Sequence, residues 1–242
     1  ATQEVKIRAK ELREAIKRYA SAATWAGQLE GPTGAVALKT LDFNLIEAFG
    51  TERDRIGALS SLASAHYTLW GNKTAHLALG KEKHRKPLEE EARGALRKAR
   101  ELMAEALRLA GRKRTTQGMW AVWGSILNSE RKYREAARAY REGLKDSKLK
   151  WHARAILLAG LAAPLARLKK FHEVEKAFEE ALKLCGSKAH PNTVRVWRKY
   201  GNYVRAMGER NVGTKYLRDA LKMARALGLE DQITKLQADL KG

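Results

Sequence analysis

Bulky, small and aromatic residues recur along the second half of the chain at intervals of 38 and 39 residues. The first set is Trp120, Trp123-Gly124, Leu127, Tyr133, Ala136, Tyr140 and Gly143-Leu144; the second is Leu158, Leu161-Ala162, Leu165, Phe171, Val174, Phe178 and Ala181-Leu182; the third is Trp197, Tyr200-Gly201, Val204, Gly213, Leu217 and Ala220-Leu221. A period of this size is typical of stacked helical hairpins, in which each unit buries its apolar face against its neighbours. We therefore expect an all-α solenoid that works through an extended surface.

Helical periodicity and turn signals predict the remaining elements. Apolar residues near helical spacing predict a helix over 4–29, and Gly31-Pro32-Thr33-Gly34 predicts a turn before a helix over 35–49. A capped start at 51–54 predicts the next helix. Residues 71–87 are the least regular, with loops expected at 71–74 and 80–87 and a helical extension between them. Further helices are expected over 87–111, 115–129, 133–146, 150–168, 171–184, 191–207, 211–227 and 230–240.

The spacing resembles the tetratricopeptide repeat (TPR). Trp120 and Trp197 match the leading large residue of that family, and Gly124 and Gly201 match the small residue at which its two helices cross closely. Later small and aromatic positions are matched by Ala136, Gly213, Tyr140, Phe178, Leu217, Ala181 and Ala220. The middle copy departs from the pattern with Leu158 in place of Trp, and each unit is four or five residues longer than the usual unit of about 34.

The resemblance divides the chain into four parts. Residues 1–50 are expected to form an N-terminal helical hairpin, and residues 51–111 a degenerate repeat with an insertion at 71–87. Residues 112–229 are expected to form three TPR-like repeats, and residues 230–242 a C-terminal capping helix. The implied architecture is a right-handed solenoid of antiparallel helical hairpins.

A large positive charge changes the picture of the partner. The 242 residues carry 48 Lys and Arg against 27 Asp and Glu, a net charge of +21. The excess is small in residues 1–50, with 7 basic against 6 acidic residues, and large in residues 111–150 and 191–242, with 11 against 4 and 11 against 5. Such a field raises encounter rates with polyanions and with acidic proteins.

Several classes of protein are disfavoured. No apolar run approaches the roughly 20 residues that span a bilayer. The N-terminus alternates charges and lacks the apolar core of a signal peptide, so we expect a cytoplasmic protein, although a chain that begins at Ala1 leaves a removed leader open. Cys185 is alone, which leaves no intrachain disulfide and no cysteine-based metal site.

Signals for catalysis are missing from the sequence. The six histidines show no metal-ligand spacing, and no Gly-rich phosphate loop is present. Gly124-Ser125 lacks the context of a nucleophile elbow, and no Ser, His and Asp set stands out. We therefore expect no enzyme, no catalytic residue, no metal and no cofactor.

TPR arrays generally bind other proteins in a concave groove lined by their first helices, so the resemblance implies such a groove here. Its partner-binding residues would be Asn128, Arg167, Arg195, Arg198, Lys199, Asn202 and Arg205. Arg195, Arg198, Asn202 and Arg205 lie at i, i+3, i+7 and i+10 and share one helix face. A carboxylate clamp with Arg198 and Asn202 four residues apart, a broader partner-binding face and a merely solvated face all stay open.

Basic clusters elsewhere are the expected sites for phosphate. These are Arg112, Lys113 and Arg114, and Lys81, Lys83, Arg85 and Lys86, for which a solubilising loop is the competing interpretation. Trp120, Trp123 and Trp197 have core positions in the repeat pattern, which leaves Trp70 and Trp151 as the better surface contacts.

Two functions follow from these patterns. The first is a non-enzymatic TPR-like scaffold or adaptor that binds an acidic protein or peptide segment on its concave, basic face. The alternative is a helical-repeat protein that binds RNA or DNA with the same positive surface, as a component of a ribonucleoprotein.

Overall fold

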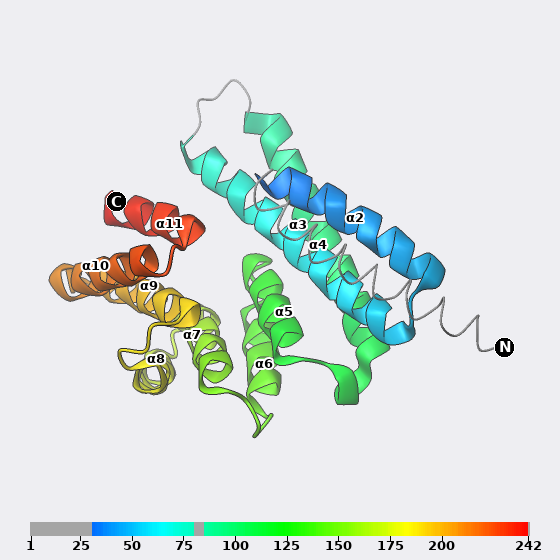
Figure 1. Ribbon diagram of the computed structural model, residues 1–242. Helices are drawn as coiled ribbons and strands as arrows, with labels where there is room; N and C mark the ends of the chain where they lie inside the picture. Colours follow the sequence, from blue (N-terminus) through cyan, green and yellow to red (C-terminus); the bar gives the residue numbers. More distant parts are fainter. Residues whose placement is uncertain (1–30, 80–84, 242) are drawn as a thin grey trace. The chain divides into compact units, whose positions relative to one another are not determined.

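The computed structural model describes residues 31–79 and 85–241 of the chain (Figure 1). Every regular element in these two ranges is an α-helix: α2 (Gly31–Phe49), α3 (Glu52–Leu79), α4 (Arg85–Arg114), α5 (Gln117–Ser129), α6 (Tyr133–Leu144), α7 (Trp151–Arg167), α8 (Phe171–Cys185), α9 (Pro191–Ala206), α10 (Arg210–Ala226) and α11 (Glu230–Lys241). The all-α class is therefore confirmed. The helix expected over 4–29 lies outside the described residues.

Two expected interruptions are helical instead, and residues 85–87 of the loop expected over 80–87 already belong to the first turn of α4. Residues 31–34, expected as a turn, are the first residues of α2, because proline and glycine are both tolerated in a first helical turn. Residues 71–74, expected as a loop, lie inside α3, where the Thr74 hydroxyl donates to the carbonyls of Trp70 and Gly71 at 3.0 and 2.9 Å. The pairing of α3 with α4 outweighs the local preference of the Gly71-Asn72 pair.

The chain divides into two compact units, with the boundary between Thr115 and Thr116. In the first unit α3 packs against both α2 and α4. Leu59 and Leu62 of α3 and Ala99 and Met103 of α4 are buried there. The second unit holds all three of the well-matched repeats.

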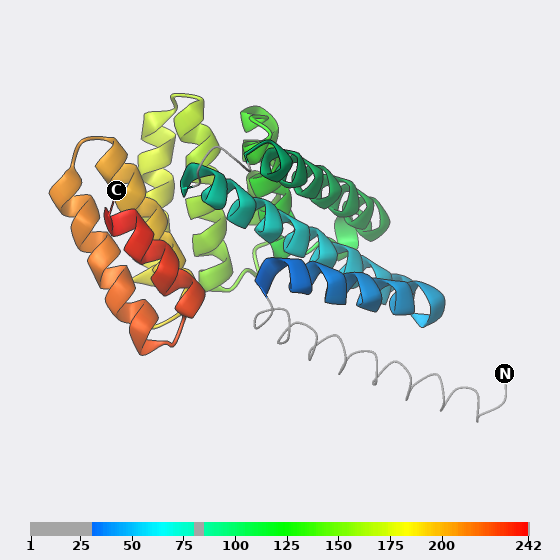
Figure 2. The same cartoon turned by 90° about the horizontal axis from the view of Figure 1, so that it is seen from above.

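The second unit is built from the hairpins α5/α6, α7/α8 and α9/α10, followed by α11 (Figure 2). The first helices of the hairpins contact one another, α5 with α7 and α7 with α9, whereas the second helices α6, α8 and α10 make no such contacts. Helices that approach each other line the inner side of a curved stack. The first helices therefore lie on the concave side of this unit, as the TPR resemblance implied.

The buried positions follow the repeat pattern. Tyr140, Phe178 and Leu217, at the predicted aromatic position of the second helices, are each at most 3% exposed. Trp120 and Trp197 are only half-buried, and each packs against the core of its own hairpin. The period of 38 and 39 residues thus marks the core of each hairpin.

Gly201 and Gly213 mark the crossing of α9 and α10. A Cβ atom added to Gly201 would lie 2.9 Å from the Gly213 carbonyl oxygen, and one added to Gly213 would overlap the Gly201 carbonyl oxygen. The two backbones are therefore in contact at this point, which confirms Gly201 as the small residue at a helix crossing. Only glycine on both helices permits this approach.

Tyr140 occupies the equivalent space in the first hairpin. A Cβ atom on Gly124 of α5 would lie 2.7 Å from the Tyr140 ring, and one on Gly160 of α7 would overlap the other edge of the same ring. The Tyr140 hydroxyl lies 2.8 Å from the Ser125 hydroxyl. The Tyr140 side chain of α6 thus joins two consecutive hairpins. At the equivalent crossings, the missing side chain of Gly124 leaves space for a tyrosine ring, whereas that of Gly201 leaves space for the backbone of the next helix.

Candidate functional site

Helix α9 begins at a cap that is unusual in its chemistry. His190 precedes the helix, and its Nδ1 atom accepts a hydrogen bond of 3.0 Å from the backbone N–H of Asn192. Pro191 occupies the first helical position, where its missing N–H costs nothing. The Asn192 side chain donates to the His152 carbonyl oxygen at 3.1 Å, which ties the start of α9 to the start of α7.

Two sides of α9 are covered by neighbouring helices. Val194 and Trp197 belong to the core shared with α10 and α11, while Val196, Tyr200 and Tyr203 belong to the core shared with α7 and α8. The remaining side carries the polar residues Arg195, Arg198, Lys199, Asn202 and Arg205, which we call the α9 basic face. The apolar residues thus set the direction in which these five side chains point.

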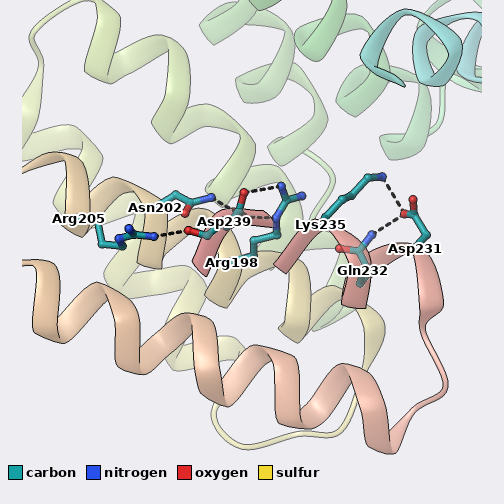
Figure 3. A network of polar contacts seen from close by, with 7 residues as sticks. All are labelled: Arg198, Asn202, Arg205, Asp231, Gln232, Lys235 and Asp239. Atoms are coloured by element: carbon teal, nitrogen blue, oxygen red, sulfur yellow. Dashed lines mark hydrogen bonds and ion pairs between the residues drawn. The ribbon is translucent and has the colours of Figure 1, made fainter. Parts of the chain in front are cut away.

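Three members of the α9 basic face bind one aspartate of α11 (Figure 3). Arg198 donates from Nε to Asp239 Oδ2 at 2.5 Å and from Nη2 to Oδ1 at 3.2 Å. Asn202 donates to Asp239 Oδ2 at 2.8 Å, and Arg205 donates to the backbone oxygen of Asp239. The predicted pair of Arg198 and Asn202 therefore does hold a carboxylate, and that carboxylate comes from this chain.

Burial makes this contact stronger than an ordinary surface ion pair. The side chains of Arg198 and Asp239 are 29% and 19% exposed. A two-pronged hydrogen bond from a guanidinium to a carboxylate is strong and directional, and partial exclusion of water strengthens it. Helix α11 is held in this place by the polar network on α9 and by its own apolar residues, chiefly Leu236, against α10.

Arg195 and Lys199, the other two members of the α9 basic face, are exposed. Neither forms an ion pair or hydrogen bond with any residue of the described ranges. Loss of hydrating water around the Lys199 ammonium, followed by the charges of Arg198 and Arg195, lowers the pKa of that group to about 8. The Lys199 residue as a whole is nevertheless exposed to solvent. Among the described residues, these two cations are therefore the members of the α9 basic face that the chain does not itself bind.

The remaining predicted groove residues lie on other first helices. Asn128 is half-buried near the end of α5, and its Oδ1 atom has no hydrogen-bond partner in the part of the chain that the structure describes. Arg167 is exposed in the last turn of α7. The structure thus brings together the five predicted residues of α9 and leaves these two apart from the Asp239 network.

The predicted phosphate-binding residues do not form one described cluster. Lys81, Lys83 and the side chains of Arg112 and Lys113 lie outside the described residues. Arg114 pairs with Glu52 at 2.9 Å, Arg85 pairs with Glu89 at 3.0 Å, and Lys86 is exposed. Two of these cations are therefore neutralised locally.

Sequence reasoning missed Asp239, the residue that organises the site. Its signal was available, because α11 follows the third hairpin in the position of a further first helix and carries acids at 230, 231 and 239. A first helix at that position must pack against α9. The acids of the capping helix were therefore the nearest candidates to meet the arginines of α9.

An aromatic cluster lies beside the cap of α9. The imidazoles of His152 and His190 stack with their ring centroids 4.6 Å apart. The Trp151 and His190 rings lie edge to face, with centroids 5.1 Å apart. Lys188 lies over the Trp151 ring at 4.8 Å. Trp151, expected as a surface contact, is thus half-buried and already packed against groups of its own chain.

We expect the second unit to lose stability as the pH falls below about 6.5. Burial, the neighbouring His152 and the charge of Arg195 lower the pKa of His190 in the folded protein. As the pH falls, His190 is therefore protonated in the unfolded chain before it is protonated in the folded protein. The contribution of His190 to the free energy of unfolding is then fully present above the pKa that His190 has in the unfolded chain. It is lost as the pH falls through the pKa that His190 has in the folded protein. Urea unfolding between pH 8 and 5 measures the effect. A His190→Asn variant keeps a capping acceptor and should remove the dependence on this residue; an unchanged slope would assign it elsewhere.

Among the described residues, neither a cavity nor a metal-binding group gives a candidate site stronger than the α9 basic face. A cavity of about 300 Å³ lies on the outer side of the second unit, lined by Arg134, Arg138, Arg141 and Lys170 around Ala137, Leu165 and Leu168. In the described ranges no group of three His, Cys, Asp or Glu side chains could hold a metal ion. No helix in those ranges has the length and apolar character needed to cross a membrane.

Comparisons with known proteins identify the fold. No protein-family model matches the sequence, and no curated protein matches it significantly. A structure from the functional characterisation of Pseudomonas aeruginosa PilF superimposes with a TM-score of 0.53 at 16% identity, over 96% of this chain and 92% of that chain. The chain has a tetratricopeptide-like helical-repeat fold.

Two further TPR-type comparisons are weaker. MamA MSR-1 C2 gives a TM-score of 0.45 at 18% identity, over 91% of this chain and 98% of that chain. The TPR2AB domain of yeast Sti1, in complex with pHSP90, gives a TM-score of 0.41 at 15% identity, over 96% of this chain and 98% of that chain. The TPR-like assignment therefore depends on the PilF comparison and on the repeat period and hairpin stacking described above.

Proposed function

We propose that this TPR-like protein is a non-enzymatic scaffold that binds an acidic protein segment on the concave side of its second unit. The observation that carries the proposal is the convergence of Arg198, Asn202 and Arg205 on Asp239. An aspartate of a helix already sits on this face in good geometry. The face therefore has the chemistry that an acidic partner requires.

The free cations of the α9 basic face define the partner's position. Arg195 and Lys199 lie one helical turn apart, about 6 Å along the helix axis, on the inner side beside the Asp239 network. A partner with carboxylates at a matching spacing would meet both cations and lie alongside α11. Residues 116–242 carry 26 Lys and Arg against 13 Asp and Glu, which favours the approach of such a segment.

The test is a pair of charge reversals with a matched control. An Arg195→Glu/Lys199→Glu variant should bind a fluorescein-labelled helical peptide with glutamates at i and i+4 at least about tenfold more weakly in fluorescence anisotropy. An Arg218→Glu/Lys222→Glu variant changes the charge equally on exposed residues of α10 and should keep the wild-type affinity. Equal losses in both variants would show attraction by net charge alone, and no loss in the first would refute the site.

An RNA or DNA ligand on the same face is the competing function. The exposed Arg195 and Lys199 would then contact phosphates in place of carboxylates. Pull-down from the native host with and without nuclease separates the two, because only a nucleic-acid-dependent partner is lost after nuclease. Persistence of the captured protein supports the acidic segment.

A further inference from the structure

Helix α10 carries a row of cations on its outer side. Lys215, Arg218, Lys222 and Arg225 lie at i, i+3, i+7 and i+10, a spacing that places them on one face of the helix. The opposite face holds Gly213, Leu217, Ala220 and Ala224, which are buried against the neighbouring helices. All four cations are exposed. We call them the α10 basic row.

None of these four side chains has an ion-pair partner within the described ranges of the chain. The α10 helix has one acidic residue, Asp219, which is itself exposed. Neighbours in the row repel each other at i, i+3 and i, i+4 spacing, which destabilises the helix. A row of this kind therefore lowers stability, and no contact among the described residues compensates for it.

Helix α8, the second helix of the preceding hairpin, is arranged differently. Helix α8 places Lys176 and Lys183 among four glutamates, Glu173, Glu175, Glu179 and Glu180. On α6, Arg141 pairs with Glu173 at 2.6 Å. Lys176 and Lys183 occupy the positions one repeat before Lys215 and Lys222, so the same two cations are surrounded by acids in one repeat and by further cations in the next.

We propose that the α10 basic row binds the phosphate backbone of a duplex nucleic acid. This function goes beyond the binding of an acidic segment by the α9 basic face, and it uses a different surface. Guanidinium and ammonium groups bind phosphate oxygens through charge-assisted hydrogen bonds. Four cations that have no acidic partner in the part of the chain that the structure describes offer such donors in one line.

The geometry favours a duplex over a single strand. Single-stranded nucleic acids are bound mainly by aromatic rings on which their bases stack. The large exposed apolar side chains of the described residues are Phe171, Met207 and Val212, none of them on the α10 basic row. Tyr216, the aromatic residue of α10, packs against Trp197 and Tyr200, with ring centroids 6.4 and 4.7 Å apart, respectively. The row therefore offers charge and no stacking platform.

The row also has a suitable length. From Lys215 to Arg225 the helix rises about 15 Å, at 1.5 Å for each residue. One strand of B-form DNA presents a phosphate about every 3.4 Å along the axis, so about four phosphates lie within that length. Four cations thus face a comparable number of phosphates.

The test measures how binding of a fluorescein-labelled DNA duplex to the full chain depends on salt. Each phosphate contact contributes about 0.9 to the slope of log K against log salt concentration. An Arg218→Gln/Lys222→Gln variant should therefore bind more weakly at low salt and show a slope that is shallower by about 1.8. A duplex RNA arm reports whether the preference extends to A-form geometry.

The control is Lys176→Gln/Lys183→Gln, which removes two exposed cations from α8 and should leave the slope unchanged. Circular dichroism verifies that all variants remain helical. No duplex binding by the wild-type protein at low salt, or equal slopes in the wild type and the α10 variant, would overturn the proposal. If the Arg195→Glu/Lys199→Glu variant still binds the duplex, the α10 basic row binds nucleic acid independently of the α9 basic face.

Discussion

A Gly213→Ala variant should lower the free energy of unfolding of the second unit by roughly 1–3 kcal/mol. The added methyl group would overlap the Gly201 carbonyl oxygen and lie 2.5 Å from Arg205 Cγ. A backbone oxygen cannot rotate away as a flexible side chain can, so α9 and α10 must move apart. Urea unfolding followed by circular dichroism, with hydrogen exchange of the α9 and α10 amides, measures the change.

The matched control is Gly118→Ala in α5, a glycine of the same unit whose new methyl group would lie 3.7 Å from Thr116 Oγ1, an ordinary van der Waals distance. Alanine is the better helix former, by about 1 kcal/mol in a helix interior. The control should therefore equal or exceed the wild-type stability. If both variants shift the midpoint in the same direction by the same amount, the crossing of α9 and α10 is not where the cost arises.

The core of the second unit was predictable because it repeats. Tyr140, Phe178 and Leu217 fall at intervals of 38 and 39 residues, and each is buried. Periodicity carries this information since equivalent residues meet equivalent neighbours in a stacked array. The same argument identified Gly201, although it could not distinguish a helix backbone at Gly201 from a tyrosine ring at Gly124.

Contacts between distant segments were not predictable in the same way. The spacing of Arg198, Asn202 and Arg205 shows that they share a face, but it does not show what lies opposite. The position of α11 after the third hairpin predicts that one of its acids meets α9, but which of the acids at 230, 231 and 239 does so depends on how the apolar residues of α11 pack against α10. Similarly, Arg114 meets Glu52 across 62 positions of sequence, so its freedom to bind phosphate could not be judged from the basic cluster alone.

The stretch 71–74 shows how tertiary packing overrides a local signal. A Gly-Asn pair usually favours a turn, yet these residues continue α3. A single helical glycine costs about 1 kcal/mol relative to alanine, which the burial of Ile56, Leu59 and Leu62 along α3 readily offsets. Helix propensity was therefore the weaker term at this position.

A Tyr140→Ala variant should lose about 3–5 kcal/mol of unfolding free energy, as large aromatic side chains do when they are removed from a core. The ring is 3% exposed and lies between Gly124 of α5 and Gly160 of α7. Two glycines have no side chains that could move into the vacated space, so the cavity stays open or the hairpins shift. Urea unfolding of the second unit measures the loss.

A Tyr140→Phe variant removes only the hydroxyl that lies 2.8 Å from the Ser125 hydroxyl, and it should lose about 0.5–1.5 kcal/mol. The larger part of the effect must then come from the ring. A loss in Tyr140→Phe as large as in Tyr140→Ala would instead assign the stability to the hydrogen bond.

A double-mutant cycle with Gly160→Ala tests the contact itself. In the wild-type background the new methyl group would overlap the Tyr140 ring, so Gly160→Ala should be destabilising. In the Tyr140→Ala background the ring is absent, and the same substitution should become neutral or stabilising because alanine favours the helix and fills part of the cavity. Such a change of sign requires that the two residues be coupled, by direct contact or through the cavity that the Tyr140→Ala substitution leaves. Additive effects would mean that α7 does not pack on this ring, and the joint between the first two hairpins would have to lie elsewhere.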